Sequence, residues 1–178
     1  MISIIFDTET TGLPKHPNAK DGVQPRIIEF AAALVDRDGE VLDTIDRLIN
    51  PGIPLEAIIT KITGLTDENL AEEPPFLDVL PDIAAFFRAA DQMIAHNLPF
   101  DSTLLQLELA RNAVTEFPWP RAALCTVQEH AEEWGRRPKL KELYAHYMGA
   151  PLDQKHRALD DVMALVDVCR AAEVLGEP

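Results

Sequence analysis

Apolar residues follow two different spacings along this chain, and its first part shows the spacing of strands. Short runs in which apolar residues predominate cover residues 2–6, 27–35 and 41–49, each bounded by polar or turn-forming residues, as is typical of β-strands. The stretch 36–39, Asp-Arg-Asp-Gly, separates the second run from the third and predicts a hairpin turn. The pattern therefore predicts an antiparallel meander, interrupted by a loop rich in Pro, Asn, Asp and Gly over residues 13–26.

The rest of the chain shows mainly helical spacing. In residues 76–90, for example, Leu77, Leu80, Ile83 and Phe87 recur every three or four positions. The predicted helices are 54–61, one that begins at Asp67 with Thr66 as its N-cap, 76–90, 102–112, 127–134, 139–148 and a last one ending near 172, and short apolar strands are predicted at 93–95 and 124–126. No repeat or linker interrupts this order, so we expect a single α/β domain over residues 1–178.

Composition and charge narrow the class of protein. With 178 residues and 47% hydrophobic content the chain can build one well-packed core. The net charge of −14 excludes broad, charge-driven binding to duplex DNA, although a single strand end gripped by metal ions remains compatible with it. Cys125 and Cys169 lack metal-site spacing, no apolar run approaches the roughly 18 residues of a membrane span, and no basic flank precedes Ile2. We expect a cytoplasmic protein with no membrane segment.

The first apolar run ends in two carboxylates. Asp7 and Glu9 are separated by one residue, so on a strand both side chains project to the same side. Two ionised carboxylates side by side repel each other, and a divalent cation with a preference for oxygen ligands, such as Mg²⁺ or Mn²⁺, would remove that cost. The alternative is a solvent-exposed turn in which Asp and Thr make local hydrogen bonds.

Further acidic residues occur where strands meet helices and in the last helix. Asp101 opens a predicted helix and is either a site residue or a helix N-cap. In the last helix Asp161 shares a face with Ala158, Leu165 and Val168, an apolar stripe that should meet the core, whereas Asp160 lies on a solvated face. A carboxylate on a buried stripe needs a partner, which makes Asp161 the site candidate.

His156 precedes Asp161 by five residues and lies on a predicted loop. A histidine titrates near neutrality and suits a general base, although a lone histidine beside Lys155 could equally be an ordinary surface residue. The loop position would let His156 reach the same reaction centre as Asp161 from another side.

Three segments together resemble a known enzyme family. Residues 6–12 (Phe-Asp-Thr-Glu-Thr-Thr-Gly), 96–101 (His-Asn-Leu-Pro-Phe-Asp) and 156–161 (His-Arg-Ala-Leu-Asp-Asp) are similar in order and spacing to the three motifs of the DEDDh 3′→5′ exonucleases. This is the family of the epsilon proofreading subunit of bacterial DNA polymerase III. Residues 28–31 and 62–66 also resemble family landmarks, so the resemblance covers nearly the whole chain.

The resemblance implies an RNase H-like fold, with a mixed central sheet, an antiparallel meander and helices on both faces. It also implies a two-metal mechanism in which two divalent ions, Mg²⁺ or Mn²⁺, activate a water and stabilise the leaving 3′-oxygen. By the same resemblance the acidic quartet would hold these ions and His156 would be the general base. The implied metal ligands are Asp7, Glu9, Asp101 and Asp161, and the residues implied to cradle the terminal nucleotide are Thr8, Thr10, Leu13, Thr63, Leu65, Asn97 and Phe100.

Two departures from the family pattern concern the nucleotide pocket. Thr63 stands where many members have a histidine, and Leu98 and Pro99 replace smaller residues. Both changes bear on substrate preference and leave the metal chemistry untouched.

The leading hypothesis is a 3′→5′ exonuclease that releases nucleoside 5′-monophosphates from single-stranded or frayed DNA ends, in proofreading or repair. An exoribonuclease that trims RNA 3′ ends, a non-catalytic module that binds nucleic acid or a partner, and another phosphoesterase are the alternatives. The expected partners are a DNA or RNA 3′ end and DNA polymerase subunits. The sequence does not determine the oligomeric state.

Overall fold

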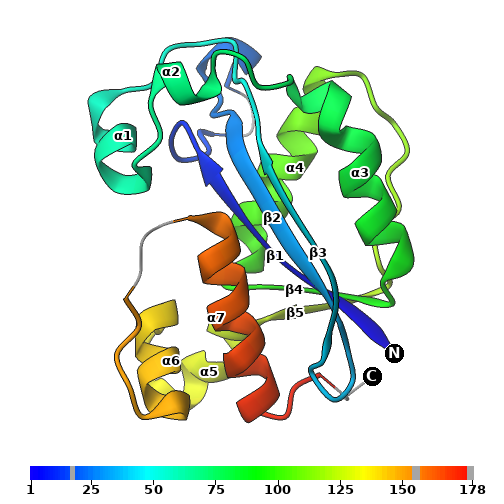
Figure 1. Cartoon of the computed structure of the whole chain (residues 1–178), viewed down its shortest axis with the longest axis vertical. Helices are drawn as coiled ribbons and strands as arrows, with labels where there is room; N and C mark the ends of the chain where they lie inside the picture. The colour runs from blue at the N-terminus through cyan, green and yellow to red at the C-terminus, as the bar shows by residue number, and fades with distance from the viewer. Residues whose placement is uncertain (17–18, 154–156, 176–178) are drawn as a thin grey trace.

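A computed structural model describes residues 1–16, 19–153 and 157–175 of the chain. At its centre is a mixed five-stranded sheet in the order β3-β2-β1-β4-β5 (Figure 1). The strands are β1 (Ile2–Thr10), β2 (Ile27–Asp36), β3 (Val41–Leu48), β4 (Gln92–Ala95) and β5 (Ala122–Cys125). β1, β2 and β3 form the predicted antiparallel meander, whereas β1, β4 and β5 run parallel to one another.

The structure contains helices at most of the positions where the sequence predicted them. They are α1 (Ala57–Thr63), α2 (Asp67–Leu70), α3 (Phe76–Ala89), α4 (Leu98–Arg111), α5 (Thr126–Trp134), α6 (Leu140–Met148) and α7 (Ala158–Ala171), with a 3₁₀ turn at Asp21–Val23. The predicted N-cap of α2 is confirmed, because the Thr66 hydroxyl accepts a hydrogen bond from the Asn69 backbone N–H at 3.3 Å.

Two predicted helices had the wrong bounds. α1 begins at Ala57 and not at 54, because Glu56 is still extended, and it ends at Thr63, two residues past the predicted end, because Gly64 with a φ of 75° stops the helix. α4 begins at Leu98, four residues before the predicted start. Pro99 fits the first helical turn, where its missing N–H removes no hydrogen bond.

Alternate residues of β1 pack into two separate cores, one on each face of the sheet. Ile4 and Phe6 belong to the core under α3 and α4, where the rings of Phe6 and Phe87 meet edge to face at 5.1 Å. Ile5 belongs to the core under α6 and α7 together with Leu165. The prediction of helices on both faces is therefore confirmed, and α7 lies across one face in Figure 1. This alternation decides where the polar residues at the end of β1 point.

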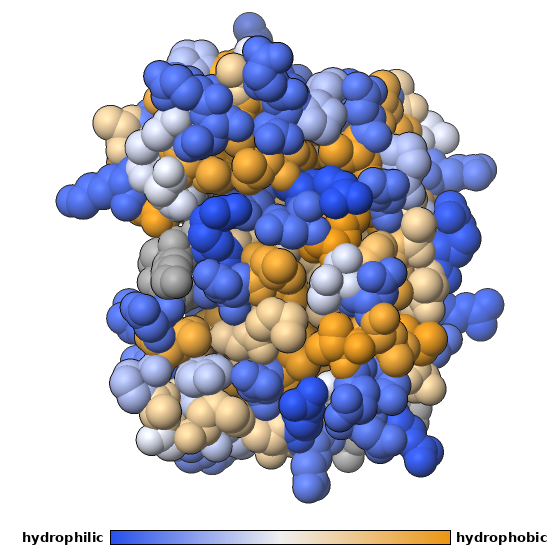
Figure 2. Space-filling view, viewed as in Figure 1, coloured by the Kyte–Doolittle hydropathy of each residue, from blue (hydrophilic) through white to orange (hydrophobic). Residues whose placement is uncertain are grey.

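The surface agrees with the composition. Hydrophilic side chains cover much of the face in Figure 2, with patches of hydrophobic side chains between them. Within residues 1–16, 19–153 and 157–175, no helix combines the length and apolarity needed to cross a bilayer.

Candidate active site

Three of the four predicted carboxylates meet beside the end of β1. One oxygen from each of Asp7, Glu9 and Asp161 can be chosen so that all three lie within 4.8 Å of one another. Asp7 and Glu9 follow Ile5 at alternate positions of β1, so they face the same layer as α7. Asp161 lies in the first turn of α7 and is only 6% exposed, whereas Asp160 is exposed. The predicted assignment of Asp161 and not Asp160 to the buried face is confirmed.

Crowding and burial disfavour the charged forms of these groups. The pKa of Asp7 is raised well above its usual value by burial first, and then by the charges of Asp101, Glu9, Asp161 and Glu29. Burial, followed by Asp161 and Glu29, raises the pKa of Glu9 to about 8. Three carboxylates held this close form an all-oxygen donor set, which fits Mg²⁺ or Mn²⁺. A bound cation would remove the repulsion that raises these pKa values.

Asp101 approaches β1 from the other face of the sheet. It is 1% exposed in the first turn of α4, and its Oδ1 accepts hydrogen bonds from the Thr8 N–H at 3.1 Å and the Thr8 hydroxyl at 2.7 Å. Burial raises the pKa of Asp101 to about 7, and the Thr8 hydrogen bonds act in the opposite direction. Asp101 lies close enough to Asp7 for its charge to raise the pKa of Asp7. The alternative that Asp101 is the N-cap was wrong, because the N-cap of α4 is Asn97.

A partly buried ion pair that the sequence analysis did not assign, between Glu29 and Arg157, holds the start of α7. Glu29 is fully buried in β2, directly opposite Glu9 in the strand register. Its Oε1 accepts hydrogen bonds from Arg157 Nε at 2.9 Å and Nη2 at 2.7 Å, and its Oε2 accepts one from the Ala158 N–H at 3.3 Å. The pair fixes the residues just before the turn that carries Asp161. A glutamate within an apolar strand is the sequence signal that could have revealed it.

Most of the residues predicted to contact a nucleotide already make hydrogen bonds or packing contacts within the protein. The Thr8 hydroxyl donates to Asp101, and the Thr10 hydroxyl donates to the Gly12 carbonyl at 2.8 Å. Thr63 is buried at the end of α1, where its hydroxyl donates to the Ile59 carbonyl at 3.0 Å and accepts from the Leu65 N–H at 3.1 Å.

Leu65, Phe100, Asn97 and Leu13 complete this set. Leu65 packs in a small core with Ile28, and Phe100 packs against the larger core under α3 and α4. Asn97 accepts a hydrogen bond from Arg137. Leu13 is 69% exposed and lines a hollow of about 590 Å³ between the loop after β1 and α1. Nucleotide contact by the seven residues stays a prediction, and His156 lies outside the described residues.

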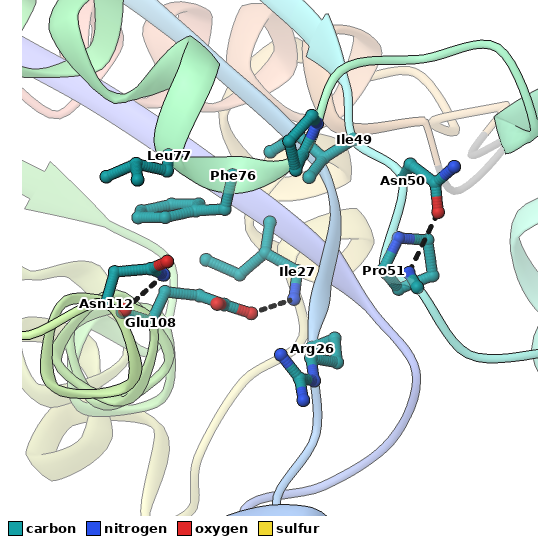
Figure 3. Close-up of a pocket in the computed structure, with 11 residues that line it drawn as sticks. Arg26, Ile27, Ile49, Asn50, Pro51, Phe76, Leu77, Glu108 and Asn112 are labelled. Carbon is teal, nitrogen blue, oxygen red and sulfur yellow. Dashed lines mark hydrogen bonds between the residues drawn. The ribbon is translucent and has the colours of Figure 1, made fainter.

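A smaller hollow lies between the start of β2, the start of α3 and the end of α4 (Figure 3). It has a volume of about 140 Å³, and none of the site carboxylates lines it. Glu108 in its wall accepts a hydrogen bond from the Ile27 N–H at 3.1 Å and pairs with Arg111 at 2.6 Å. Glu108 is 3% exposed and its carboxylate is already paired within the protein, which indicates a structural role for this residue.

Known proteins that are similar to this chain include exonucleases and DNA polymerases. The model of an exonuclease family, RNase T, matches residues 4–169. The PolC-type DNA polymerase III of Bacillus subtilis (strain 168) is 36% identical over 121 residues, which are 64% of this chain and 8% of that protein. The chain spans about a tenth of the length of the curated relatives it matches.

Two solved structures share the fold. Exonuclease X in complex with 5′ overhanging duplex DNA matches with a TM-score of 0.66 at 24% identity, covering 94% of this chain and 90% of that one. The nuclease domain of 3′hExo, a DEDDh family member bound to rAMP, matches with a TM-score of 0.77 at 17% identity, covering 95% of this chain and 90% of that one. The predicted RNase H-like fold class is thereby confirmed.

Proposed function

Because the chain belongs to the RNase T exonuclease family and is of its DEDDh 3′→5′ type, we propose that it removes nucleoside 5′-monophosphates from the 3′ ends of single-stranded or frayed DNA by a two-metal mechanism. The observation that carries the proposal is the cluster of Asp7, Glu9 and Asp161, whose ligand oxygens lie within 4.8 Å of one another. Asp101 is the fourth acid, since its charge acts on Asp7.

The acids would hold two divalent ions, Mg²⁺ or Mn²⁺. When bound, such ions lower the pKa of a water molecule and stabilise the charge on the leaving oxygen. Asp7 acts from the centre of the group, since the charges of Glu9, Asp101 and Asp161 all raise its pKa. Glu29 and Arg157 keep α7 in place, so that Asp161 faces β1. His156 is proposed to take the proton from the attacking water.

The terminal nucleotide would lie beside the loop that follows β1. The hollow there is lined by Thr11, Gly12 and Leu13 on one side and by Ile58 and Ile59 of α1 on the other. An exposed leucine near isoleucines offers aliphatic side chains against which a base can pack. The partners proposed are a nucleic-acid 3′ end and, by similarity to PolC-type polymerases, a DNA polymerase.

An RNA 3′ end is the second candidate substrate. The matched nuclease domain of 3′hExo is bound to rAMP, whereas the matched exonuclease X is bound to DNA. Thr63, one of the residues predicted to cradle the nucleotide, donates its hydroxyl to the Ile59 carbonyl and accepts from the Leu65 N–H, so its hydroxyl has no second proton to donate to a ribose. This observation favours DNA.

The test is digestion of 5′-labelled DNA and RNA strands of the same sequence, with Mn²⁺ and with a chelator. We expect a ladder of products shortened from the 3′ end, faster on DNA, and no products with the chelator or with Asp7→Asn. Titration calorimetry with Mn²⁺ should show binding that Asp7→Asn weakens. Metal-independent cleavage, or undiminished cleavage by Asp7→Asn, would refute the mechanism.

A further inference from the structure

The segment between α5 and α6 is the most basic part of an acidic chain. The protein has 30 Asp and Glu against 16 Lys and Arg, yet Arg136, Arg137, Lys139 and Lys141 fall within residues 136–141. All four residues are exposed. Arg136 is already paired, because its Nη1 and Nη2 donate to Glu142 at 2.8 Å and 3.0 Å. Arg137 and Lys139 therefore supply most of the positive charge available beside the hollow described next.

Arg137 and Lys139 line a hollow of about 450 Å³ at the edge of the sheet. Its other walls are His96 and Asn97 after β4, Val127 in α5, and Pro138 and Leu140. This lining contains two cationic side chains and no carboxylate. Four other hollows in the described part of the chain each include a carboxylate, namely Glu108, Asp67, Glu116 or Glu56. A cation-lined hollow in a protein of net charge −14 is suited to an anion.

His96 and Arg137 differ in what they can offer a ligand. Burial lowers the pKa of His96 to about 4, against a smaller effect of the Pro138 backbone, so the ring is neutral near pH 7, and its Nδ1 is already 3.0 Å from the Thr126 hydroxyl oxygen. The Arg137 guanidinium donates to Asn97 Oδ1 and retains further N–H donors. The first turns of α5 and α6 also face the hollow, through Val127 and Leu140, and the positive ends of these helices reinforce its attraction for anions.

The hollow lies beside the candidate active site along one edge of the sheet. β1, β4 and β5 are parallel neighbours, so their C-terminal ends lie together. Asp7 and Glu9 lie toward the end of β1, and Asn97 at the end of β4 precedes Asp101 by one helical turn. In Figure 1, α1 lies at one end of the view and α6 near the other, with the start of α7 between them. The hollow lined by Arg137 and Lys139 and the hollow beside α1 that contains Leu13 thus flank the carboxylates from opposite sides.

We propose that Arg137 and Lys139 bind backbone phosphates of the substrate strand on the 5′ side of the cleaved bond. This inference rests on the proposed function, because it assumes that a strand enters the site by its 3′ end. The terminal nucleotide occupies the hollow beside α1, and the rest of the strand passes across the hollow that Arg137 and Lys139 line. Guanidinium and ammonium groups bind phosphate oxygens without reading bases, so the contact raises affinity for DNA and RNA strands alike.

The test compares the double variant Arg137→Gln and Lys139→Gln with a control that loses the same charge, Arg37→Gln and Arg88→Gln. Arg37 lies in the β2–β3 hairpin and Arg88 near the end of α3, both exposed and away from the C-terminal ends of the parallel strands. The substrates are a single strand of about 15 nucleotides and p-nitrophenyl thymidine 5′-phosphate, which offers only the terminal nucleotide. The readout is the ratio of KM for the strand to KM for the ester, at several salt concentrations.

Loss of two phosphate contacts should flatten the slope of log KM against log salt by about 1.4, since each contact on a single strand contributes about 0.7. Between about 50 mM and 200 mM salt, KM for the strand should therefore rise about sevenfold more in the parent protein than in the double variant. At low salt the KM ratio should be higher in the double variant. The control should keep the parent slope.

A second measurement separates the phosphate-site hypothesis from the proposed exonuclease function. It is the binding affinity for the same strand, labelled with fluorescein, in the presence of a chelator. If the parent cleaves both substrates and the double variant keeps its salt slope and binding affinity, the phosphate site is wrong and the proposed function stands. If the parent cleaves neither substrate but binds the strand more tightly than the double variant does, the phosphate site stands and the proposed function is wrong. Equal weakening in the control would also overturn the phosphate site.

Discussion

Replacing Glu9 by Gln should stabilise the metal-free protein while it impairs the site. Glu9 lies beside Asp7 and Asp161, and its pKa is raised from 4.5 to about 8, mainly by burial and then by Asp161 and Glu29. A group whose pKa is higher in the folded state keeps its proton there more readily than in the unfolded chain. Its stabilising effect is complete below about pH 4.5 and is lost as the pH rises through 8.

The magnitude follows from the size of this pKa shift. At about 1.4 kcal/mol for each pH unit between the two pKa values, the full shift corresponds to a penalty of roughly 5 kcal/mol above pH 8. Glu9 is only partly buried, and solvent screening reduces this figure. We expect Glu9→Gln to raise the free energy of unfolding by about 1–3 kcal/mol at pH 9 and by close to zero at pH 4.5.

The assay is urea denaturation between pH 4.5 and pH 9 in the presence of a chelator. Glu72→Gln is the matched control, because Glu72 is exposed and lies outside the site. Added Mn²⁺ should reverse the order at pH 9, since a cation bound only to the folded state stabilises the parent more than the variant. If Glu9→Gln is no more stable than the parent at pH 9 without metal, or if its advantage does not shrink as the pH falls, the electrostatic argument fails.

Three further substitutions test the parts of the site separately. Asp161→Asn should lower Mn²⁺-dependent release of mononucleotides by about a hundredfold or more. Asp160→Asn, on the exposed face of α7, should leave most of this activity. Equal losses in an end-labelled digestion would contradict the assignment of Asp161, and not Asp160, to the site. Glu29→Gln should lower the free energy of unfolding in urea by about 1–3 kcal/mol, because Arg157 and the Ala158 N–H lose a charged partner. The kcat should also fall, although Glu29 lies outside the cluster of Asp7, Glu9 and Asp161. An unchanged kcat would show that the position of the start of α7 does not depend on the ion pair. Thr8→Val should weaken Mn²⁺ binding in calorimetry and cost about 1 kcal/mol, because Asp101 loses a hydroxyl donor at 2.7 Å, and Thr8→Ser should restore both.

Local patterns in the sequence were sufficient for much of the fold. The apolar runs of the meander, the N-cap at Thr66 and the helical spacing of 76–90 depend on neighbouring residues, and the structure confirms each of them. The same holds for three site acids. Alternation along a strand is enough to put Asp7 and Glu9 on one side, and the apolar stripe of α7 is enough to separate Asp161 from Asp160. The exonuclease family, inferred from three motifs in order, is also confirmed.

Contacts between distant segments were decided by the tertiary structure alone. Asp101 meets Thr8 across 93 positions, and Arg157 meets Glu29 across 128. Arg137 meets Asn97 across 40 positions, which turns an ordinary basic loop into one wall of a hollow beside the site. No local spacing encodes such pairs, because they depend on strand order, register and helix packing. The sequence by itself therefore determined which acids face the site, and only the folded chain decided which residues position those acids and where the substrate strand meets positive charge.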